Sequence, residues 1–235
     1  MNDYQVTDLM RRVRTVIDMN PTDTALTDIG NVETLNLDDI IRDSLVPAAQ
    51  LIELRAPIEM LGVGKMADTA YTTSSVDNSL SADTDGNVCH TGKCPTDFMR
   101  LVFFKMKGWA RAVTDYIAPN SPLYAMQRSR VAAVRGCPDR PIFVVSTSKS
   151  GNNLVQTWEA YTAPKAATVE TFAYLPIPTI VDGTLALCPL LVDATVYATA
   201  YLAASAYGAT AQAQNHLTTA LALAGVSQSQ QPTDQ

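Results

Sequence analysis

Hydrophobic residues near the start of the chain recur every three or four positions, the spacing of one helix face. The stripe from Val6 to Ile17 predicts a helix over residues 3–19, with Asp3 as its cap and Pro21 beyond its end. The arginines in this segment lie off the stripe. We therefore expect them on a solvated or partner-facing side.

The next apolar stripe predicts a second helix that starts at Asn36, its cap, and ends before Pro57. Pro47 lies inside it, and its missing N–H and its ring predict a kink or a break there. Asp38 and Asp39 fall in the first turn, where carboxylates favour the positive end of the helix dipole.

Two more helices are predicted towards the end of the sequence. Pro189 stands at a first-turn position and opens a helix that runs to about Tyr207. Gly208 separates it from a last helix over residues 209–224, and Gly225 marks the end of that helix.

The middle of the chain is typical of β-structure, with short runs of β-branched and aromatic residues. The predicted strands cover residues 98–109, 110–117, 141–148, 154–161 and 169–175. We expect the last three to share one sheet, with a hairpin turn between the first two of them. Ser121 and Pro122 predict the start of a short helix, and residues 66–97 predict a long polar loop.

These elements predict an α+β fold, in which two N-terminal and two C-terminal helices form a bundle with a β-rich central extension. We assign residues 1–57 and 185–225 to the helical bundle and residues 58–184 to the extension. Residues 226–235 are of low complexity and predict a flexible C-terminal arm.

Charge is unevenly distributed along the chain. Residues 1–99 hold 7 basic and 16 acidic residues, residues 100–140 hold 8 basic and 2 acidic, and residues 166–235 hold 4 acidic residues and no lysine or arginine. The net charge of −6 argues against a free-standing nucleic-acid binder, because phosphate affinity depends on clustered cations. A long stretch without cations makes a poor solvated surface, so we expect partner subunits to cover much of it. The plainer alternative is a core segment followed by a polar tail.

No catalytic motif is recognisable in the sequence. It contains neither a phosphate-binding loop nor a nucleophile elbow, and His90 and His216 are its two histidines. We place His216 on the polar face of the last helix, at the surface or in an interface. The sequence therefore predicts no enzyme activity, no catalytic residue and no cofactor.

Cys89, His90 and Cys94 form a metal-like cluster, and the distant Cys137 is the candidate for a fourth ligand. Zinc needs four ligands, usually in closely spaced pairs, so this irregular spacing favours a turn with incidental thiols, and we predict no metal site. Four cysteines are ordinary for a cytoplasmic product. We expect neither a secretion signal nor a membrane span.

Several stretches resemble one family, in the order in which they occur. They are PTDFMRLVFFKMKGWARAV (95–113), SPLYAMQRSR (121–130), GCPDRPIFVVS (136–146), AYLPIP (173–178) and LCPLLVDATVYATAYLAASAYG (187–208), after an N-terminal helix of the DLMRRVRTVID type. With them the chain resembles the connector or ring proteins of crAss-like phages, which are similar to the head-to-tail adaptor proteins of short-tailed phages. The resemblance covers most of the chain, although the 66–90 loop matches nothing in that family.

The resemblance implies a structural virion protein in the neck of a tailed phage, assembled in the cytoplasm of the bacterial host. Members of the family form a dodecameric ring beneath the portal, extend the DNA channel and carry the next ring or tail protein. Double-stranded DNA would pass through the lumen without sequence-specific binding, and no membrane is involved. By position in related adaptors, the C-terminal arm is the candidate portal-binding segment, through Val226, Ser227, Gln228, Gln230 and Gln231.

A cyclic ring needs two different patches on each subunit, one meeting the other on the next copy. The acidic first 99 residues and the basic 100–140 segment are candidates for these patches. Our candidate interface residues are Arg111, Arg128 and Arg130 on the basic side and Asp38 and Asp39 on the acidic side.

Two alternatives stay open. One is another virion component, such as a minor coat or tail protein. The other is a small ligand-binding or enzymatic domain that uses the β-rich middle, which would require a concave pocket with convergent polar groups.

Overall fold

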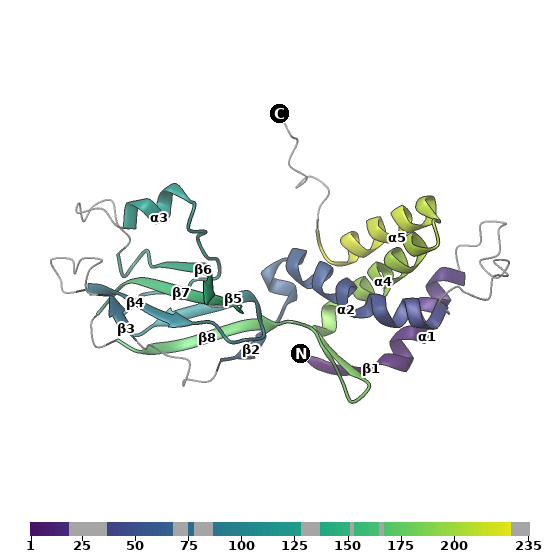
Figure 1. Cartoon of the computed structure of the whole chain (residues 1–235), viewed down its shortest axis with the longest axis horizontal. Coiled ribbons are helices and arrows are strands. Elements are labelled where there is room, and N and C mark those ends of the chain that lie inside the picture. Colours follow the sequence, from purple (N-terminus) through teal and green to yellow (C-terminus); the bar gives the residue numbers. More distant parts are fainter. Residues whose placement is uncertain are drawn as a thin grey trace. The chain divides into compact units, whose positions relative to one another are not determined.

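The computed structural model describes residues 1–18, 37–67, 75–77, 87–127, 137–150, 153–164 and 167–226. The chain is α+β, with α-helices and antiparallel β-sheets. It divides into two compact units: unit 1 comprises Met1–Gly62 and Ile177–Gln235, and unit 2 comprises Val63–Pro176 (Figure 1). Each unit has a hydrophobic core of its own.

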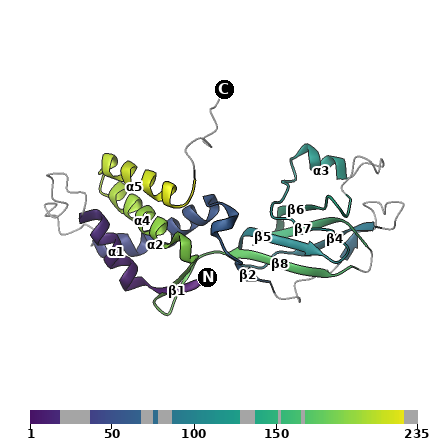
Figure 2. The ribbon, with the colours of Figure 1, turned by 180° about the vertical axis from the view of Figure 1, so that it is seen from behind.

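Unit 1 holds the long helices of the described chain. They are α1 (Val6–Asp18), α2 (Leu37–Arg55), α4 (Val192–Ala206) and α5 (Thr210–Leu223), with the short 3-10 helices η2 (Ile58–Met60) and η6 (Pro189–Leu191). A small antiparallel sheet has the order β1 (Asn2–Gln5), β10 (Thr184–Leu187) and β9 (Ile180–Val181). α4 is the central helix, because it packs extensively against both α5 and α2 and also touches α1 (Figure 2).

The first helix begins later than its pattern predicts. Residues 2–5 form β1, which pairs with β10, so Asp3 lies in a strand and does not cap α1. The apolar stripe itself is confirmed, since its residues Val6, Leu9, Val13 and Ile17 are all buried. The strand was missed because Tyr4 is its one residue packed against the core, so the sequence NDYQ shows no hydrophobic alternation.

α2 runs through Pro47 without a break, so of the two outcomes expected there, a kink or a break, the break does not occur. Pro47 is exposed, whereas Leu45, Ala48 and Ala49 beside it are completely buried. Tertiary packing of this buried face offsets the hydrogen bond that proline cannot donate. The two predicted C-terminal helices are confirmed as η6 with α4 and as α5.

Unit 2 consists of two antiparallel sheets that pack on each other. One has the order β2 (Lys65–Met66), β8 (Val169–Pro176) and β5 (Phe98–Met106). The other has the order β3 (Ser75–Asp77), β4 (Asn87–Lys93), β7 (Asn153–Pro164) and β6 (Ile142–Ser150). Aromatic side chains from both sheets meet in the core, as in the stacked pair of Phe104 and Phe143, whose ring centroids are 4.2 Å apart.

Two predictions for this region are wrong. The polar loop expected over 66–97 contains β4, which pairs with β7 and buries Cys89 and His90. Residues 169–175 were expected to join the sheet of the β6–β7 hairpin, but β8 pairs instead with β5 and β2. Alternation identifies a strand but not its partner, which is decided by the packing of the whole unit.

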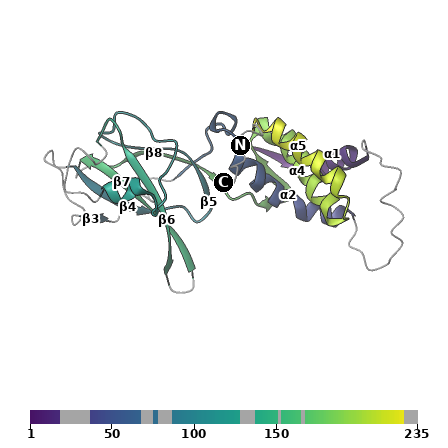
Figure 3. The same cartoon turned by 90° about the horizontal axis from the view of Figure 1, so that it is seen from above.

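The hairpin of β6 and β7 is confirmed, with Ile142 opposite Tyr161 and Ser150 opposite Asn153. β4 pairs with β7 only as far as Thr157. Beyond that residue β6 and β7 continue together as a two-stranded ribbon (Figure 3).

The residues after Gly108 do not form the predicted second strand. Val113 makes a single bridge to Phe104 of β5, and Ile117 makes one to Val144 of β6. Because β5 and β6 are the edge strands of the two sheets, this segment covers an edge of each. It leads into the short helix α3 (Pro122–Gln127), which begins at the predicted proline.

Candidate assembly surfaces

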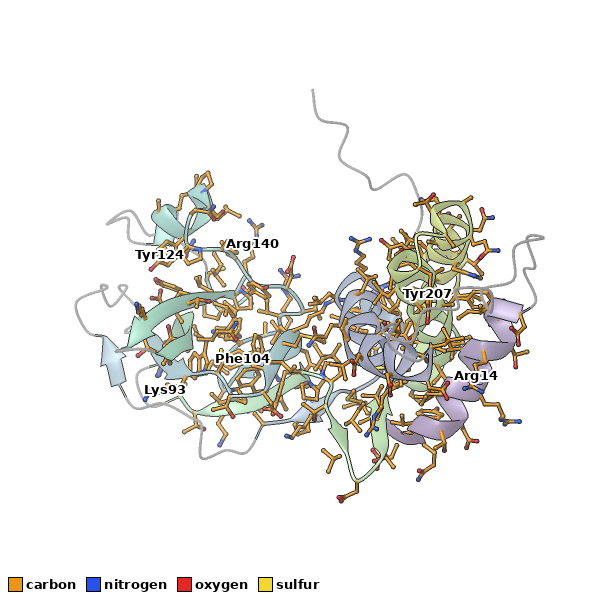
Figure 4. The ribbon with its side chains drawn as sticks, turned by 45° about the vertical axis from the view of Figure 1, so that its right-hand side comes forward. Arg14, Lys93, Phe104, Tyr124, Arg140 and Tyr207 are labelled. Carbon is orange, nitrogen blue, oxygen red and sulfur yellow. The ribbon has the colours of Figure 1, made fainter. Side chains whose placement is uncertain are left out.

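The arginines of α1 are engaged with neighbouring helices of their own subunit. Arg12 forms an ion pair with Asp193 of α4. Arg14 donates from Nε to Oδ1 of Asp38 in α2 at 2.7 Å, and this carboxylate raises the pKa of Arg14 (Figure 4). Exposed ion pairs contribute little to stability, so their main effect is to fix how α1 lies on α2 and α4.

The predicted interface residues differ in whether they already have a partner in their own subunit. Asp38 already has a partner in its own subunit, whereas Asp39 is exposed. Arg111 is exposed in unit 2, and Arg128 and Arg130 lie outside the described residues. Of the described candidates, Asp38 and Asp39 belong to unit 1 and Arg111 belongs to unit 2, and the pairing of acidic with basic residues between copies stays a prediction.

Only the start of the predicted C-terminal arm is described. The N–H of Val226 bonds to the carbonyl of Leu221 at 2.9 Å, and that of Gly225 bonds to Ala222 at 3.1 Å, with Gly225 at φ +70°. This is a Schellman cap, so Val226 belongs to the end of α5. Ser227, Gln228, Gln230 and Gln231 lie outside the described residues.

The histidines and cysteines are placed differently from the predictions. His216 is 2% exposed and lies against the ring of Tyr197, so its predicted surface position is wrong, and burial lowers its pKa. Cys89 and His90 lie in β4 and not in a turn. Among the described residues, no three His, Cys, Asp or Glu side chains are grouped as metal ligands would be.

A groove of about 260 Å³ lies between α1 and α4 in unit 1. The Arg12–Asp193 ion pair and Arg11 contribute its charged lining, and Val196 and Tyr197 contribute apolar surface. The lining also includes Thr15, whose hydroxyl donates to the carbonyl of Arg11 at 3.0 Å.

Glu53 is a buried carboxyl group that sequence analysis missed. It lies in α2 with no exposed surface, and burial raises its pKa to about 7, against the opposing effect of the Cys188 backbone and thiol donors. The Cys188 thiol also lies 3.1 Å from the carbonyl of Leu61. The sequence gives no signal for this burial. Glu53 directly follows the apolar stripe position Ile52, and the stripe predicts a solvated side chain at the next position.

The outer face of α5 carries no charge. None of its fourteen residues is Asp, Glu, Lys or Arg, and its one titratable group, His216, is buried. The exposed residues are Thr210, Ala211, Gln214, Asn215, Thr218, Ala222 and Leu223. We call them the α5 face. Soluble surfaces usually carry about a quarter to a third charged residues, so the α5 face is suited to being covered by protein.

The division into units is also a division of charge. Unit 1 has 5 basic and 14 acidic residues, a net charge of −9, whereas unit 2 has 12 basic and 9 acidic residues, a net charge of +3. The acidic and basic segments of the sequence, 1–99, 100–140 and 166–235, do not coincide with the boundaries of the units. The acidic C-terminal stretch belongs to the same unit as the acidic N-terminal one, which only the fold reveals.

Neither a family model nor a curated protein matches this chain. In the described part of the chain, no helix combines the length and the apolar character that crossing a membrane requires.

Proposed function

We propose that this chain is a structural virion protein, which forms a ring in the portal-proximal neck of a tailed phage. In this proposal the ring is dodecameric, links the head portal to the tail and extends the DNA channel. The protein acts by binding copies of itself and its neighbours, and no reaction takes place on it.

One observation carries the proposal: the two compact units of one chain have opposite net charges, −9 and +3. A ring requires heterologous contacts, in which one patch of a subunit meets a different patch of the next. Opposite charge on the two units favours this head-to-tail order and disfavours contact between like units. The family resemblance of the sequence supplies the biological setting.

The helices of unit 1 would form the bundle that builds the body of the ring, and the β-rich unit 2 would be its extension. The uncharged α5 face fits this assignment, because a ring buries such surface at every subunit boundary. The C-terminal arm would reach the portal. The net charge of −6 per chain suits a channel whose walls repel phosphate and let DNA slide.

The test is assembly on the portal. The chain and the portal protein of the same phage are expressed separately and together, and each preparation is measured by light scattering after size exclusion and by electron microscopy. We expect co-purification and a twelve-fold ring of this chain on the portal. A truncation after Val226 should weaken portal binding and leave the fold intact.

Two results would overturn the proposal. One is a chain that neither binds the portal nor forms a ring under any mixing order. The other is a twofold or monomeric state in mature virions, shown by microscopy of the particle, which would favour a minor coat or tail component.

A further inference from the structure

The short helix α3 presents an apolar surface in unit 2. Leu123 and Met126 are 50% and 42% exposed, and their spacing of three places them on one side of the helix. Tyr116, in the segment that leads to α3, is 40% exposed. We call these three residues the α3 patch.

Tyr124 anchors α3 to its own unit, because its side chain packs against the cluster of Cys89, Val144 and Tyr161. Gln127 is buried, and its Nε2 donates to the carbonyl of Leu123 within the helix at 2.9 Å. The Tyr124 hydroxyl lies 3.3 Å from Oε1 of Glu159 in β7. The α3 patch is therefore held on a fixed base, and its exposed apolar side chains are not a consequence of a detached helix.

α3 belongs to a stretch of sequence with an excess of basic residues. Residues 100–140 hold eight basic residues and two acidic ones, Asp115 and Asp139. In the described part of this stretch Lys107, Arg111 and Arg140 are exposed, as are both acidic residues, and Arg140 lies on the same side of unit 2 as Tyr124 (Figure 4). An apolar patch on a unit with a net charge of +3 suits an uncharged surface on an acidic protein unit.

Unit 1 offers such a surface. The α5 face is free of charge, and α5 packs chiefly on α4, so its outer side is available. The same unit has a net charge of −9, and its segment 177–235 contains no basic residue. Covering the α5 face removes no charged group from water. Its desolvation therefore costs less free energy than that of a charged surface, which favours contact with Leu123 and Met126.

We infer that the α3 patch of one copy docks on the α5 face of the next copy. This contact rests on the proposed ring and specifies which surfaces close it. It is heterologous, so repeating it gives a closed ring when the rotation from one copy to the next divides a full turn evenly. The opposite charges of the two units set the order of docking, and the apolar side chains provide the buried area.

A substitution pair tests the energetic part. Leu123→Gln removes the apolar side chain from the α3 patch, and Leu190→Gln is the matched control, because Leu190 is 65% exposed in η6 and belongs to neither surface. We expect Leu123→Gln to weaken ring assembly at least tenfold, read from the chain concentration at half-assembly, and Leu190→Gln to leave it unchanged. The melting temperature of both variants should equal that of the unchanged chain, since neither side chain is in a core.

A cross-link tests the geometry. Cys89, Cys94 and Cys188 are buried and Cys137 is exposed, so a Cys137→Ser background leaves no accessible thiol among them. A chain with Met126→Cys is mixed with a chain carrying Thr218→Cys, assembled and treated with a short bismaleimide. We expect covalent dimers, and we expect none when Thr15→Cys, an exposed position of α1, replaces Thr218→Cys.

The contradicting outcomes are distinct. Rings that form normally with Leu123→Gln and give no Met126–Thr218 link would overturn this contact and leave the ring itself standing. Linking of Met126→Cys to the portal or a tail protein, or within one chain carrying both cysteines, would assign the α3 patch to another partner. Absence of any ring from the unchanged chain with its portal would remove the proposed function and this contact together.

Discussion

The two units bury their cores in different ways. All five phenylalanines and both tryptophans of the chain lie in unit 2. Phe104 is the centre of this aromatic core, because its ring contacts four others at centroid distances between 4.2 and 5.7 Å: Trp109, Phe143, Trp158 and Phe172. The core of unit 2 is thus concentrated in a few large side chains from both sheets.

The core of unit 1 contains no phenylalanine or tryptophan. It is built from aliphatic residues and alanine, and α4 alone buries Ala194, Ala198, Ala200, Ala203 and Ala204. Small side chains let helices approach closely, so that backbone and short side chains make the contact. The burial is distributed over many residues, each of which contributes little.

The contrast teaches where each unit is vulnerable. A concentrated aromatic core should lose much of its stability when one central ring is removed. A distributed core should tolerate single truncations and respond instead to a buried charge or to added bulk. The tryptophans help to test this, because their fluorescence reports only on unit 2, while the helical circular dichroism signal comes mainly from unit 1.

The largest effect should come from Phe104→Ala. The substitution removes a fully buried ring from the centre of the cluster, and changes of this kind cost about 3–5 kcal/mol of unfolding free energy. Phe103→Ala on the same strand is the control, since Phe103 is only partly buried. In denaturant unfolding, we expect the fluorescence midpoint to shift far more than the helical signal. Equal shifts of both signals would show that the units unfold as one and would break the contrast.

Glu53→Gln should stabilise unit 1 at alkaline pH. The pKa of Glu53 is raised from 4.5 to about 7 in the folded chain, so the folded state binds more protons than the unfolded state between these values. Stability attributable to this group therefore falls as pH rises from about 4.5 through 7 and is constant above that. The variant lacks this loss, so we expect a gain of roughly 2–3 kcal/mol at about pH 8.5 and almost none at about pH 4.

The measurement for Glu53 is the helical melting transition as a function of pH. Glu59→Gln is the control, because Glu59 is exposed in the adjacent η2. If the melting temperature of the Glu53→Gln variant depends on pH in the same way as that of the unchanged chain, Glu53 is not the source of the pH dependence.

Gly92→Ala should destabilise unit 2 by overpacking. Gly92 pairs with Trp158 across β4 and β7, and an added Cβ would lie 2.3 Å from the indole carbon Cζ2. The fully buried ring has little room to move, so we expect a loss of about 1–3 kcal/mol, read from tryptophan fluorescence. The control Gly183→Ala lies in unit 1, so its loss is read from the helical circular dichroism signal. No atom lies near the added Cβ there, and we expect only the smaller cost of a residue held at φ +74°. Equal losses at both glycines would mean that the indole contact is unimportant.

The smallest effect should come from the ion pair of α1 and α4. Arg12 and Asp193 are both substantially exposed, so a double-mutant cycle of Arg12→Ala and Asp193→Ala should give a coupling energy of about 0.5 kcal/mol or less. Raising the salt concentration should reduce it further. A coupling above about 1.5 kcal/mol would instead identify the pair as a major support of unit 1.

The local elements followed from short-range physics and were largely predictable. Helical periodicity located α1, α2, α4 and α5, and proline and glycine marked where α3 and α4 begin and where α5 ends. β5, β6 and β7 were recognisable from alternation, and the turn between β6 and β7 from its residues. These features depend only on neighbours in the sequence, which is why the pattern alone revealed them.

Strand pairing, the burial of polar side chains and the net charge of each unit depended on the tertiary structure. β1 and β4 are polar strands that exist because β10 and β7 pair with them, and β8 joined a different sheet from the one expected. His216 and Glu53 were buried by helices distant in sequence, against their polarity. The number of charges in each segment could be counted from the sequence. Only the fold shows that the N-terminal and C-terminal segments form one acidic unit, separate from the basic unit 2.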